Sequence, residues 1–472
     1  MIIEENIMIG MHNSDFGDVS HIFRSYDIRG IVGKDLSPDI MRRIGQAFGS
    51  YVKQDIMLAH DCRTHSTILK TAFMEGFLSC GLDIEDAGLL TLGAGMFHAW
   101  KNEKIYAYIT GSHLTKEWNG IKFFHANGIG FIDDTNRKIR DKFFDGKFLS
   151  GDGKSVTSDN TGIVKKYRDY LLSKLRLRNK ISVVLDCGNG CAGLIAPRLF
   201  REAGAETSVI FEELDGDFPN HLPDPQDFAL VELKKRVVET GSDIGIAYDG
   251  DGDRTALIDD KGNFTSPEET SCLILSELLK TQKGDVVANV ECTKAIDMIA
   301  AKFNRKVIRV PVGHTFLMDA VHKHKASFGV ESAAHYCIPY FVPFDDSTVV
   351  GLYAAQILSE REEKLSDFKK RVPKYPFARV SFECPDSLKF GIIKNIAAKA
   401  SKEFRQVNTM DGLRVDIENG WALLRASNTS PYVRLTVEGV TENDKKGIQK
   451  MFLDYLKEEM QKHGLELIPE HK

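Results

Sequence analysis

A loop of six residues carries the strongest chemical signal in this chain: Asp249-Gly250-Asp251-Gly252-Asp253-Arg254. Three carboxylates stand at every second position, and the glycines between them allow the positive φ angles that can direct all three toward one point. Magnesium prefers oxygen ligands in near-octahedral geometry and keeps some positions for water or phosphate. Arg254 would place a fixed positive charge beside such an ion. We therefore predict a magnesium site that serves phosphate chemistry.

An acidic surface hairpin and a calcium-binding loop are the other interpretations of this segment. Three carboxylates so close together are unfavourable in a surface turn unless a cation holds them. A calcium loop of the helix-loop-helix type requires Gly at its sixth position and Glu at its twelfth. Counted from Asp249, those positions hold Arg254 and Asp260, so magnesium is favoured.

A second loop offers a nucleophile. Thr110-Gly111-Ser112-His113 follows a predicted strand, which is where open α/β sheets usually bind ligands. A serine at such a junction can be an exposed nucleophile or a carrier of phosphate. The alternative is a plain polar turn, which would be preferred if this loop stood alone.

Two more loops hold side chains suited to polar, anionic ligands. Gly329–His335 offers Glu331 and His335, which can bind sugar hydroxyls, although a strand end with an incidental histidine is an equal alternative. Arg425–Pro431, with Arg434 beyond it, combines guanidinium, hydroxyl, amide and backbone N–H groups. Such a set suits a phosphate dianion and is less typical of an ordinary Ser/Asn-rich turn.

Strand-like and helix-like segments alternate in three rounds, and they would position these loops. Alternating βαβ units imply largely parallel sheets covered on both faces. After Pro373 the pattern changes to hairpin-like strands around 412–437, between two helices. The predicted fold class is α/β: three related mixed α/β domains plus a C-terminal α+β domain. Predicted strands are Ile56–His60, Ile105–Thr110, Val183–Asp186, Ile244–Tyr248, Val286–Val290, Val307–Pro311 and Ser327–Glu331; predicted helices are 38–53, Thr67–Cys80, Ile163–Leu175, one ending near Glu202, Ser347–Leu358 and one from Glu442.

Composition excludes several classes of protein. The 472 residues exceed one hydrophobic core and correspond to about three or four domains. Apolar residues at 42% and charged residues at 27% are typical of a soluble globular protein. A net charge of −5 argues against nucleic acid as a partner. No apolar run approaches the roughly 20 residues that span a bilayer, and residues 1–20 are interpreted as a polar extension, not a signal peptide.

Cysteine spacing indicates the redox compartment. The eight cysteines are scattered, and no pair has zinc-finger or C-x-x-C redox spacing. In a long chain this predicts reduced, mostly buried thiols. We therefore predict a cytoplasmic protein with no membrane partner.

Together, the four loops in this order and spacing resemble the α-D-phosphohexomutase superfamily, in particular its phosphomannomutase/phosphoglucomutase group. Three segments strengthen the match: Phe23-Arg24-Ser25-Tyr26-Asp27-Ile28-Arg29-Gly30, Asp186-Cys187-Gly188-Asn189-Gly190 and Asp217-Phe218-Pro219-Asn220-His221. The resemblance covers almost the whole chain, and the ordered set is far more specific than any one motif. It implies four domains around a central cleft: an N-terminal extension at 1–20, domain I at 21–160 with the phosphoserine loop, domain II at 161–260 with the metal loop, domain III at 261–373 with the sugar-binding loop, and domain IV at 374–472 with the phosphate-binding loop.

The resemblance also implies a mechanism. In such enzymes the serine that matches Ser112 carries a phosphoryl group, and one Mg²⁺ per chain is bound by that phosphoserine together with Asp249, Asp251 and Asp253. The phosphoryl group passes to a hexose 1- or 6-phosphate, and the resulting hexose 1,6-bisphosphate, which also acts as activator, returns its other phosphate to the serine. The implied activity is interconversion of hexose 1-phosphate and hexose 6-phosphate, with mannose and/or glucose.

The same match assigns the other candidate site residues. Groups near the reacting centre are Arg29, Lys122, Arg254 and His314; the general acid and base are left open among Arg29, Lys122 and His314. Glu331 and His335 would hold sugar hydroxyls, and the Arg425 loop the non-reacting phosphate. The Asp186-Cys187-Gly188 turn is interpreted as structural. The full substrate-binding set is Tyr26, Glu331, His335, Arg425, Ser427, Asn428, Thr429 and Arg434.

Five residues, at four places in the chain, depart from the family pattern. Leu114-Thr115 replaces the usual Asn-Pro after the serine, which puts the shape of that loop in question. Ala333 stands where a serine hydroxyl is usual in the sugar loop, and Ser430 stands where Glu is common in the phosphate loop. Glu291 occupies a position where some relatives carry Lys, so one phosphate or sugar contact is expected to be lost.

Two alternatives to this function remain: a phosphoglucosamine mutase, and a catalytically impaired sugar-phosphate-binding protein on the same scaffold. Retention of Ser112, the three aspartates and Arg254 favours an active enzyme, because binding alone needs no phosphoserine–metal set. Ser427-Asn428-Thr429 is the form usual in the phosphomannomutase/phosphoglucomutase group, whereas phosphoglucosamine mutases more often carry Ser-Gly-Thr. The predicted partners are phosphorylated hexoses, with the protein as monomer or homodimer.

Overall fold

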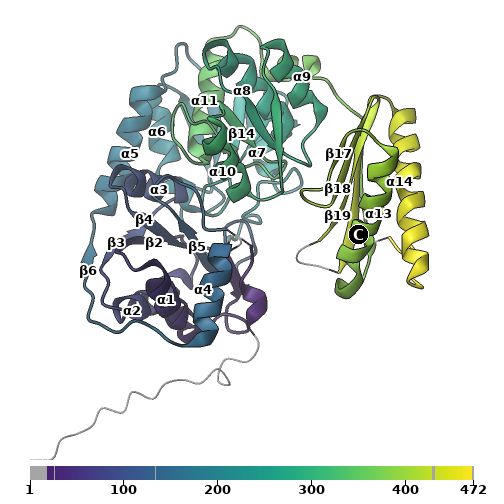
Figure 1. Ribbon diagram of the computed structural model, residues 1–472. Coiled ribbons are helices and arrows are strands. Elements are labelled where there is room, and N and C mark those ends of the chain that lie inside the picture. The colour runs from purple at the N-terminus through teal and green to yellow at the C-terminus, as the bar shows by residue number, and fades with distance from the viewer. Residues whose placement is uncertain (1–18, 26, 133, 428–430, 470–472) are drawn as a thin grey trace, which may run out of the picture. The chain divides into compact units, whose positions relative to one another are not determined.

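The computed structural model describes residues 19–25, 27–132, 134–427 and 431–469 (Figure 1). The chain forms two compact units. Unit 1 comprises Met1–Phe264 and Phe341–Glu362, and unit 2 comprises Thr265–Tyr340 and Glu363–Lys472. Each unit contains two sheets with their own helices.

The first sheet of unit 1 has six strands in the order β1-β5-β4-β2-β3-β6. Its core strands β4, β2, β3 and β6 run parallel, whereas β5 is antiparallel to both β4 and β1. The elements of this part are η2 (Ser20–Ile22), β1 (Ile28–Ile31), α1 (Pro38–Val52), β2 (Ile56–His60), α2 (Ser66–Leu78), β3 (Ile84–Leu89), α3 (Leu92–Lys101), β4 (Ile105–Ile109), β5 (Trp118–Phe124), α4 (Asp134–Asp145), β6 (Ser155–Thr157) and α5 (Asn160–Lys174).

Helices α1 and α2 pack closely on one face of this sheet. Ser37 caps α1 by accepting from the backbone N–H of Ile40 at 3.2 Å. The two helix backbones approach so closely that a Cβ on Gly76 would lie 1.8 Å from the carbonyl oxygen of Arg42. Beneath them the rings of Phe48 and Phe123 stack with centroids 3.8 Å apart, which joins α1 to β5. The loops at the strand ends therefore rest on a rigid layer.

The second sheet of unit 1 has the order β11-β10-β9-β7-β8. β8, β7 and β9 run parallel, and β10 returns antiparallel to β9. Although α11 lies about a hundred residues further along the chain, it packs against β9 and β10. The elements are β7 (Ser182–Asp186), η3 (Cys191–Leu194), α6 (Ala196–Ala203), β8 (Glu206–Ile210), α7 (Val231–Thr240), β9 (Ile244–Tyr248), β10 (Thr255–Asp259), β11 (Phe264–Thr265) and α11 (Ser347–Ser359).

Unit 2 contains a four-stranded sheet, β13-β12-β14-β15, and a five-stranded sheet, β16-β20-β19-β18-β17. The first is parallel except for β15, and the second is antiparallel with α13 and α14 on one face (Figure 1). The elements are α8 (Pro267–Thr281), β12 (Val286–Asn289), α9 (Lys294–Lys302), β13 (Val307–Val310), α10 (His314–His324), β14 (Phe328–Val330), β15 (Tyr336–Cys337), α12 (Leu365–Arg371), β16 (Phe377–Glu383), α13 (Asp386–Glu403), β17 (Val407–Asn408), β18 (Leu413–Ile417), β19 (Gly420–Ala426), β20 (Tyr432–Gly439) and α14 (Glu442–Lys462).

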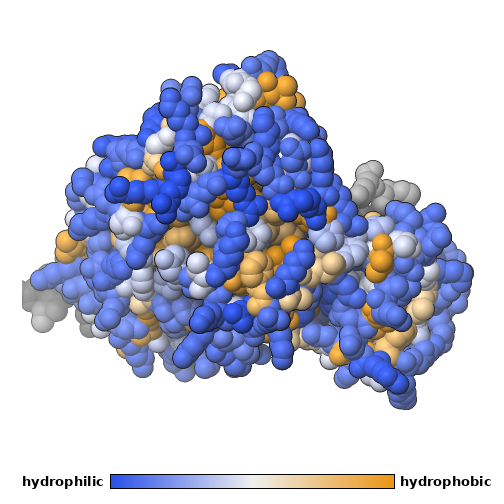
Figure 2. All heavy atoms as spheres, turned by 90° about the horizontal axis from the view of Figure 1, so that it is seen from above, coloured by the Kyte–Doolittle hydropathy of each residue, from blue (hydrophilic) through white to orange (hydrophobic). Residues whose placement is uncertain are grey.

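The predicted fold class is confirmed, and the parallel sheet cores are as expected. The sequence pattern missed the parallel strands β3, β6 and β8 and the antiparallel strands β1, β5, β10 and β15. Short connections allow β5, β10 and β15 to return beside the preceding strand without a crossover helix. All eight cysteines are free thiols. Among the described residues, no helix is long and apolar enough to cross a membrane. The face in Figure 2 is mostly hydrophilic, with hydrophobic residues in patches between polar ones.

Candidate active site

The serine loop is a tight turn at the carboxyl end of β4. The backbone N–H of Ser112 donates to the Thr110 hydroxyl at 2.7 Å, and Ser112 has a left-handed φ of +52°. This conformation is strained for a residue other than glycine. Ser112 is fully buried, and its Oγ lies 3.3 Å from Asp249 Oδ2 and 3.4 Å from His113 Nδ1. The strained turn thus places the hydroxyl against the acidic loop.

Arg63, in the loop after β2, holds the serine turn in shape. Its guanidinium is buried and lies 3.2 Å from the carboxylate of Asp61. A planar guanidinium offers five N–H groups in fixed directions. Gly111 is needed because a Cβ there would lie 2.7 Å from Arg63 Cζ. Two N–H-bearing nitrogens of Arg63 donate, at 2.5 to 3.2 Å, to four backbone oxygens: those of Ser112, Leu114, Thr115 and Trp118.

These contacts bear on the question of whether Leu114-Thr115, in place of the usual Asn-Pro, changes the shape of the serine loop. Arg63 binds both residues through backbone carbonyl oxygens, so the contact does not depend on their side chains. The shape of the serine loop is therefore set by Arg63, in the loop after β2, and not by the side chains that follow Ser112.

Thr110 links the serine loop to the acidic loop. Its hydroxyl lies 2.8 Å from Asp61 Oδ2 and 3.0 Å from Asp251 Oδ2, so it donates to this pair of carboxylates. Asp61 also accepts from the Ser66 hydroxyl and from the backbone N–H of Gly111. A buried carboxylate with several donors is held in one orientation, and Asp61 thereby fixes the entry to the turn.

The acidic loop is the turn between β9 and β10, where Tyr248 pairs with Thr255. Unlike an acidic surface hairpin, it is buried: none of its three aspartates is more than 1% exposed. Asp249 Oδ1 accepts from the backbone N–H groups of Asp253 and Arg254 at 2.9 and 3.0 Å. One carboxylate oxygen from each of the three aspartates lies within 4.8 Å of the others. The predicted convergence of the carboxylates is therefore present.

Lys122, on β5, is a cation in direct contact with the aspartates. Its Nζ donates to Asp253 Oδ2 at 2.7 Å and to Asp251 Oδ2 at 3.2 Å, and the side chain is fully enclosed. Burial lowers the pKa of Lys122, but the charges of Asp251 and Asp253 outweigh it and raise the pKa above its ordinary value. Arg29, on β1 beside β5, is also buried and forms an ion pair with Asp27 at 2.6 Å.

The electrostatics of the cluster favour a further cation. Burial, followed by the negative charges of Asp253 and Asp251, raises the pKa of Asp249 well above its ordinary value. Three buried carboxylates repel one another, and one lysine balances only part of that charge. The backbone and guanidinium of Arg254 lower the Asp249 pKa, and its side chain lies 3.9 Å from Asp224.

The residues fit a hard divalent cation. All donors at the cluster are oxygens, as magnesium requires, and the Ser112 hydroxyl borders it. Asp251 Oδ1 is buried and has no hydrogen-bond partner among the described residues, which is costly unless a cation contacts it. Asp249, Asp251, Asp253 and Ser112 would hold such an ion.

The Asp186-Cys187-Gly188 turn lies directly behind the acidic loop. The backbone N–H of Cys191 donates to the carbonyl oxygen of Gly250 at 2.9 Å, and a Cβ on Gly190 would lie 2.8 Å from the same oxygen. Asp186 accepts from the N–H of Gly188 and pairs with His221 at 3.1 Å. These contacts support a structural role for the turn.

In unit 2 the sugar loop is built around Glu331. Its carboxylate accepts from the backbone N–H of Gly313 at 2.6 Å and from Asn289 Nδ2 at 3.2 Å, and its own N–H donates to the carbonyl oxygen of His335. The rings of His314 and His335 stack with centroids 5.1 Å apart. The loop thus brings Glu331 and His335 together with His314, which the sequence analysis had assigned to the reacting centre and not to the sugar loop.

Glu291 has a protein partner of its own. Its Oε2 accepts from Arg379 Nη2 at 3.1 Å and from the Ser332 hydroxyl at 3.2 Å. This carboxylate therefore connects β16 to the sugar loop, where a lysine at the same position would repel Arg379. Glu291, which departs from the family pattern, is therefore paired with the cation Arg379 on another element.

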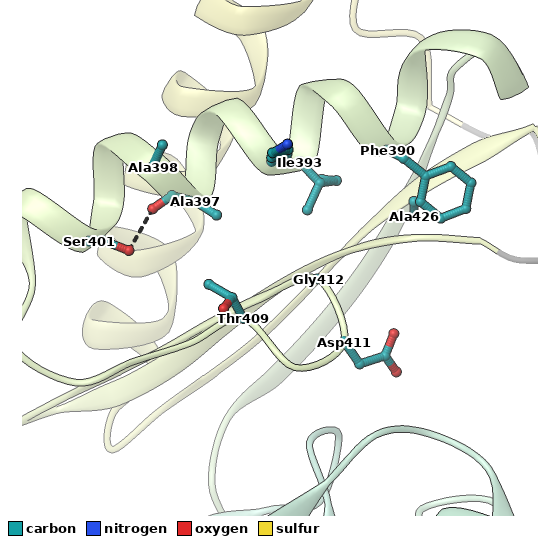
Figure 3. Close-up of a pocket in the computed structure, with 10 residues that line it drawn as sticks. Phe390, Ile393, Ala397, Ala398, Ser401, Thr409, Asp411, Gly412 and Ala426 are labelled. Atoms are coloured by element: carbon teal, nitrogen blue, oxygen red, sulfur yellow. Dashed lines mark hydrogen bonds between the residues drawn. The ribbon is translucent and has the colours of Figure 1, made fainter. Parts of the chain in front are cut away.

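The phosphate loop follows β19, and Arg425 and Arg434 are register partners on β19 and β20. Arg425 Nε lies 2.9 Å from both oxygens of Asp411, and Asp411 also accepts from the N–H of Val312. Beside the loop, a cavity of about 470 Å³ lies between α13 and the Asp411-Gly412 turn (Figure 3). Its lining combines apolar side chains such as Phe390 and Ile393 with the polar side chains of Lys394, Ser401, Thr409 and Asp411.

Some predicted residues lie outside the described part of the chain: Tyr26, Asn428, Thr429 and Ser430. Ser427 is described, and its N–H donates to the carbonyl oxygen of Tyr432 at 2.9 Å. Sequence reasoning missed Asp61 and Arg63, and it placed Thr110 in the serine loop without assigning it a role. The available signal was position: Asp61 and Arg63 follow the apolar strand β2 at its carboxyl end, where the other polar loops also lie.

Comparison with known proteins gives a consistent result. Segments of the chain match the four domains of one family, described as phosphoglucomutase/phosphomannomutase alpha/beta/alpha domain I (20–150), domain II (165–262), domain III (266–375) and C-terminal domain (379–454). The X-ray structure of a phosphoglucomutase/phosphomannomutase family protein from Burkholderia thailandensis superposes with a TM-score of 0.84 at 27% identity, over 93% of this chain and 97% of that one.

Three curated relatives have similar sequence identity to this chain but are named for different sugars. A phosphomannomutase/phosphoglucomutase from Pseudomonas syringae pv. tomato is 31% identical over 92% of this chain and 95% of its own. A phosphoglucosamine mutase from Methanococcus vannielii is 32% identical (88% and 94%), and a phosphopentomutase from Thermococcus kodakarensis is 30% identical (89% and 94%). Identity alone therefore does not separate these sugars.

The chain belongs to the phosphoglucomutase/phosphomannomutase family of the α-D-phosphohexomutase superfamily, as its loops suggested. It is an enzyme of the phosphohexomutase class, an isomerase that acts by intramolecular phosphotransfer.

Arg63 provides a test of how the serine loop is positioned. Arg63→Lys keeps the charge but cannot reproduce a guanidinium that bonds four carbonyl oxygens. We expect the free energy of unfolding, measured in urea, to fall by about 2 kcal/mol or more, and mutase turnover to fall at least tenfold. Arg42→Lys, at an exposed ion pair with Glu75, is the matched control and should change little. Equal behaviour of the two variants would show that Arg63 does not hold the loop.

Proposed function

We propose that this enzyme interconverts hexose 1-phosphate and hexose 6-phosphate, with mannose and glucose as the sugars, through a phosphoserine at Ser112 and a hexose 1,6-bisphosphate intermediate. The observation that carries the proposal is the placement of the Ser112 hydroxyl, buried and 3.3 Å from a carboxylate of the three-aspartate cluster. A plain polar turn would leave such a hydroxyl in solvent.

The residues of unit 1 suit phosphoryl transfer. The transferred group has little need for covalent catalysis, and the protein contributes mainly by positioning it and balancing the charge that develops on its oxygens. Arg63 and Asp61 would fix the direction of Ser112, while Lys122 and Arg29 would supply positive charge near it. Magnesium bound by Ser112 and the three aspartates would supply the larger part of that charge.

The residues of unit 2 suit the rest of the substrate. Glu331 and His335 are proposed to bind sugar hydroxyls, and Arg425, Ser427 and Arg434 the phosphate that does not react. Asn428, Thr429 and Tyr26 are proposed for the substrate by family resemblance. We do not assign the general acid or the general base among Arg29, Lys122 and His314.

A preference for mannose and glucose is supported by three arguments. A bisphosphate that must bind in two orientations cannot be recognised tightly at one hydroxyl, and the two sugars differ only in one hydroxyl orientation. Ala333 removes a hydroxyl from the sugar loop, and an absent partner loosens selectivity without creating a clash. Asn428 also resembles the phosphomannomutase/phosphoglucomutase group, whereas phosphoglucosamine mutases more often carry Gly at this position.

The phosphorylated residue can be tested by substitution. Ser112→Ala should lose essentially all mutase turnover and keep its fold, because a turn hydroxyl contributes little to stability. Intact-mass measurement of the purified protein should show one added phosphate that is missing in the variant. Ser173→Ala, at an exposed serine of α5, should keep both phosphate and activity. A stable phosphate on another residue, with Ser112→Ala still active, is the contrary result.

The metal is tested separately. Asp251→Asn should lower turnover far more than it weakens substrate binding, because the ion's charge is needed most while the phosphoryl group transfers. EDTA should inactivate the wild-type protein and added magnesium should restore it. Asp227→Asn, at an exposed ion pair, serves as control. Full activity after complete chelation would refute the magnesium assignment.

Sugar choice is tested by kinetics. With catalytic bisphosphate supplied, kcat/KM for mannose and glucose phosphates should agree within about a hundredfold, the scale of one modest contact. Glucosamine phosphates and a pentose phosphate should be assayed in parallel, because relatives of similar identity are named phosphoglucosamine mutase and phosphopentomutase. A strong preference for glucosamine phosphate over both hexoses would replace the present assignment with phosphoglucosamine mutase.

A further inference from the structure

The cavity beside the phosphate loop has no part in the proposed reaction. Helix α13 forms one wall, and the turn before β18 that holds Asp411 and Gly412 forms the other (Figure 3). Ala426, at the end of β19, also lines it. Binding sites for small molecules usually have volumes of about 300 to 1,000 Å³. At about 470 Å³ this cavity is large enough to hold one such molecule.

The wall formed by α13 is mainly apolar. Phe390, Ile393, Ala397 and Ala398 all line the cavity from this helix, and Phe390 is 56% exposed. An aromatic ring exposed beside a cavity offers a flat apolar surface to a ligand. The two alanines leave space that longer side chains would fill. This wall therefore suits a molecule with a flat apolar body.

Among the described residues that line the cavity, two are charged: Lys394 and Asp411. The Asp411 carboxylate does not point toward α13 (Figure 3), and both of its oxygens lie 2.9 Å from Arg425 Nε. The side chain of Lys394 forms no ion pair or hydrogen bond with any described residue. Lys399, further along α13, pairs with Glu458 at 2.8 Å. The charge that the cavity offers to a ligand is therefore positive.

We propose that this cavity binds a small amphipathic anion, with its apolar body against Phe390 and Ile393 and its single acidic group at Lys394, and that the bound anion strengthens binding of the sugar phosphate. The Thr409 hydroxyl, from the opposite wall, can donate a further hydrogen bond to the ligand. The effect on the sugar phosphate rests on the proposed role of Arg425, whereas binding of the anion does not.

The Asp411-Gly412 turn connects the cavity to the phosphate loop. Asp411 holds Arg425 and also accepts from the backbone N–H of Val312 at 2.9 Å. Gly412 has a left-handed φ of +86°, and a Cβ there would lie 2.3 Å from the carbonyl oxygen of Leu424, directly before Arg425. A ligand packed against this turn restricts its motion, so Arg425 is held more firmly in position to bind phosphate. By linkage, the sugar phosphate must strengthen binding of the anion by the same factor.

The test measures binding of two fluorescent probes to the full-length protein. One is 8-anilinonaphthalene-1-sulfonate, an amphipathic anion, and the other is N-phenyl-1-naphthylamine, which has the same rings without the sulfonate. Lys394→Gln should raise the Kd of the anionic probe about tenfold, the effect of losing one charge-assisted hydrogen bond, and should leave binding of the neutral probe unchanged. Lys402→Gln, at an exposed lysine of α13 outside the cavity, is the matched control and should bind both probes as the wild type does.

A second variant tests where the probes bind. Ala398 is exposed on α13 and lines the cavity, so Ala398→Trp fills part of that space without disturbing the core. This variant should bind neither probe at this site, with its fold checked by circular dichroism. The coupling is measured by repeating the wild-type titration with a saturating concentration of whichever sugar phosphate the enzyme turns over. The Kd of the anionic probe should then fall about fivefold.

Three results would overturn the proposal. They are unchanged binding of the anionic probe by Lys394→Gln, retention of both probes by Ala398→Trp, and a sugar phosphate that displaces the probe or leaves its Kd unchanged. Displacement would place the probe in the active site. A preference for a sugar other than mannose or glucose would refute the proposed function but not this site, because the coupling is measured with the sugar that the enzyme uses.

Discussion

The confinement of three carboxylates in a buried loop is the constraint on which the rest of unit 1 depends. Asp249, Asp251 and Asp253 lose hydration and repel one another, and burial raises the pKa of Asp249 for that reason. The protein compensates with Lys122, with backbone N–H groups and with the Thr110 hydroxyl. This compensation is incomplete, since Asp251 keeps a buried oxygen without a hydrogen bond among the described residues. A divalent cation would complete it.

The surrounding fold can be understood as the means of holding this arrangement. Two sheets contribute the loops after β2, β4, β7 and β9, and Lys122 comes from an antiparallel strand beside them. α11 reinforces the acidic loop from a distant part of the chain, because the Ser347 hydroxyl donates to the carbonyl oxygen of Gly252. Ser112 is held by Arg63 in a strained conformation, so its direction is decided by the tertiary structure and not by local preference.

Local signals predicted much of this architecture. The apolar strands Ile56–His60 and Ile244–Tyr248 were placed at their observed bounds, and the acidic and serine loops were identified from residue type and spacing. The role of Arg63 could not be read from the sequence, because it depends on carbonyl oxygens about fifty positions away. The pairing of Glu291 with Arg379 was missed because the two side chains are 88 positions apart in the sequence. Long-range contacts to backbone atoms leave no mark on the identity of the residues that accept them.

The central claim is that Ser112 donates its phosphoryl group to the sugar phosphate, and a single-turnover experiment tests it most directly. Phosphorylated protein is mixed with a stoichiometric amount of mannose 1-phosphate and magnesium, without added bisphosphate, and quenched at short times. The account predicts that phosphate lost from Ser112, read by intact mass, equals the hexose 1,6-bisphosphate formed. Retention of the protein phosphate while product accumulates, or its release as inorganic phosphate without bisphosphate, would contradict it.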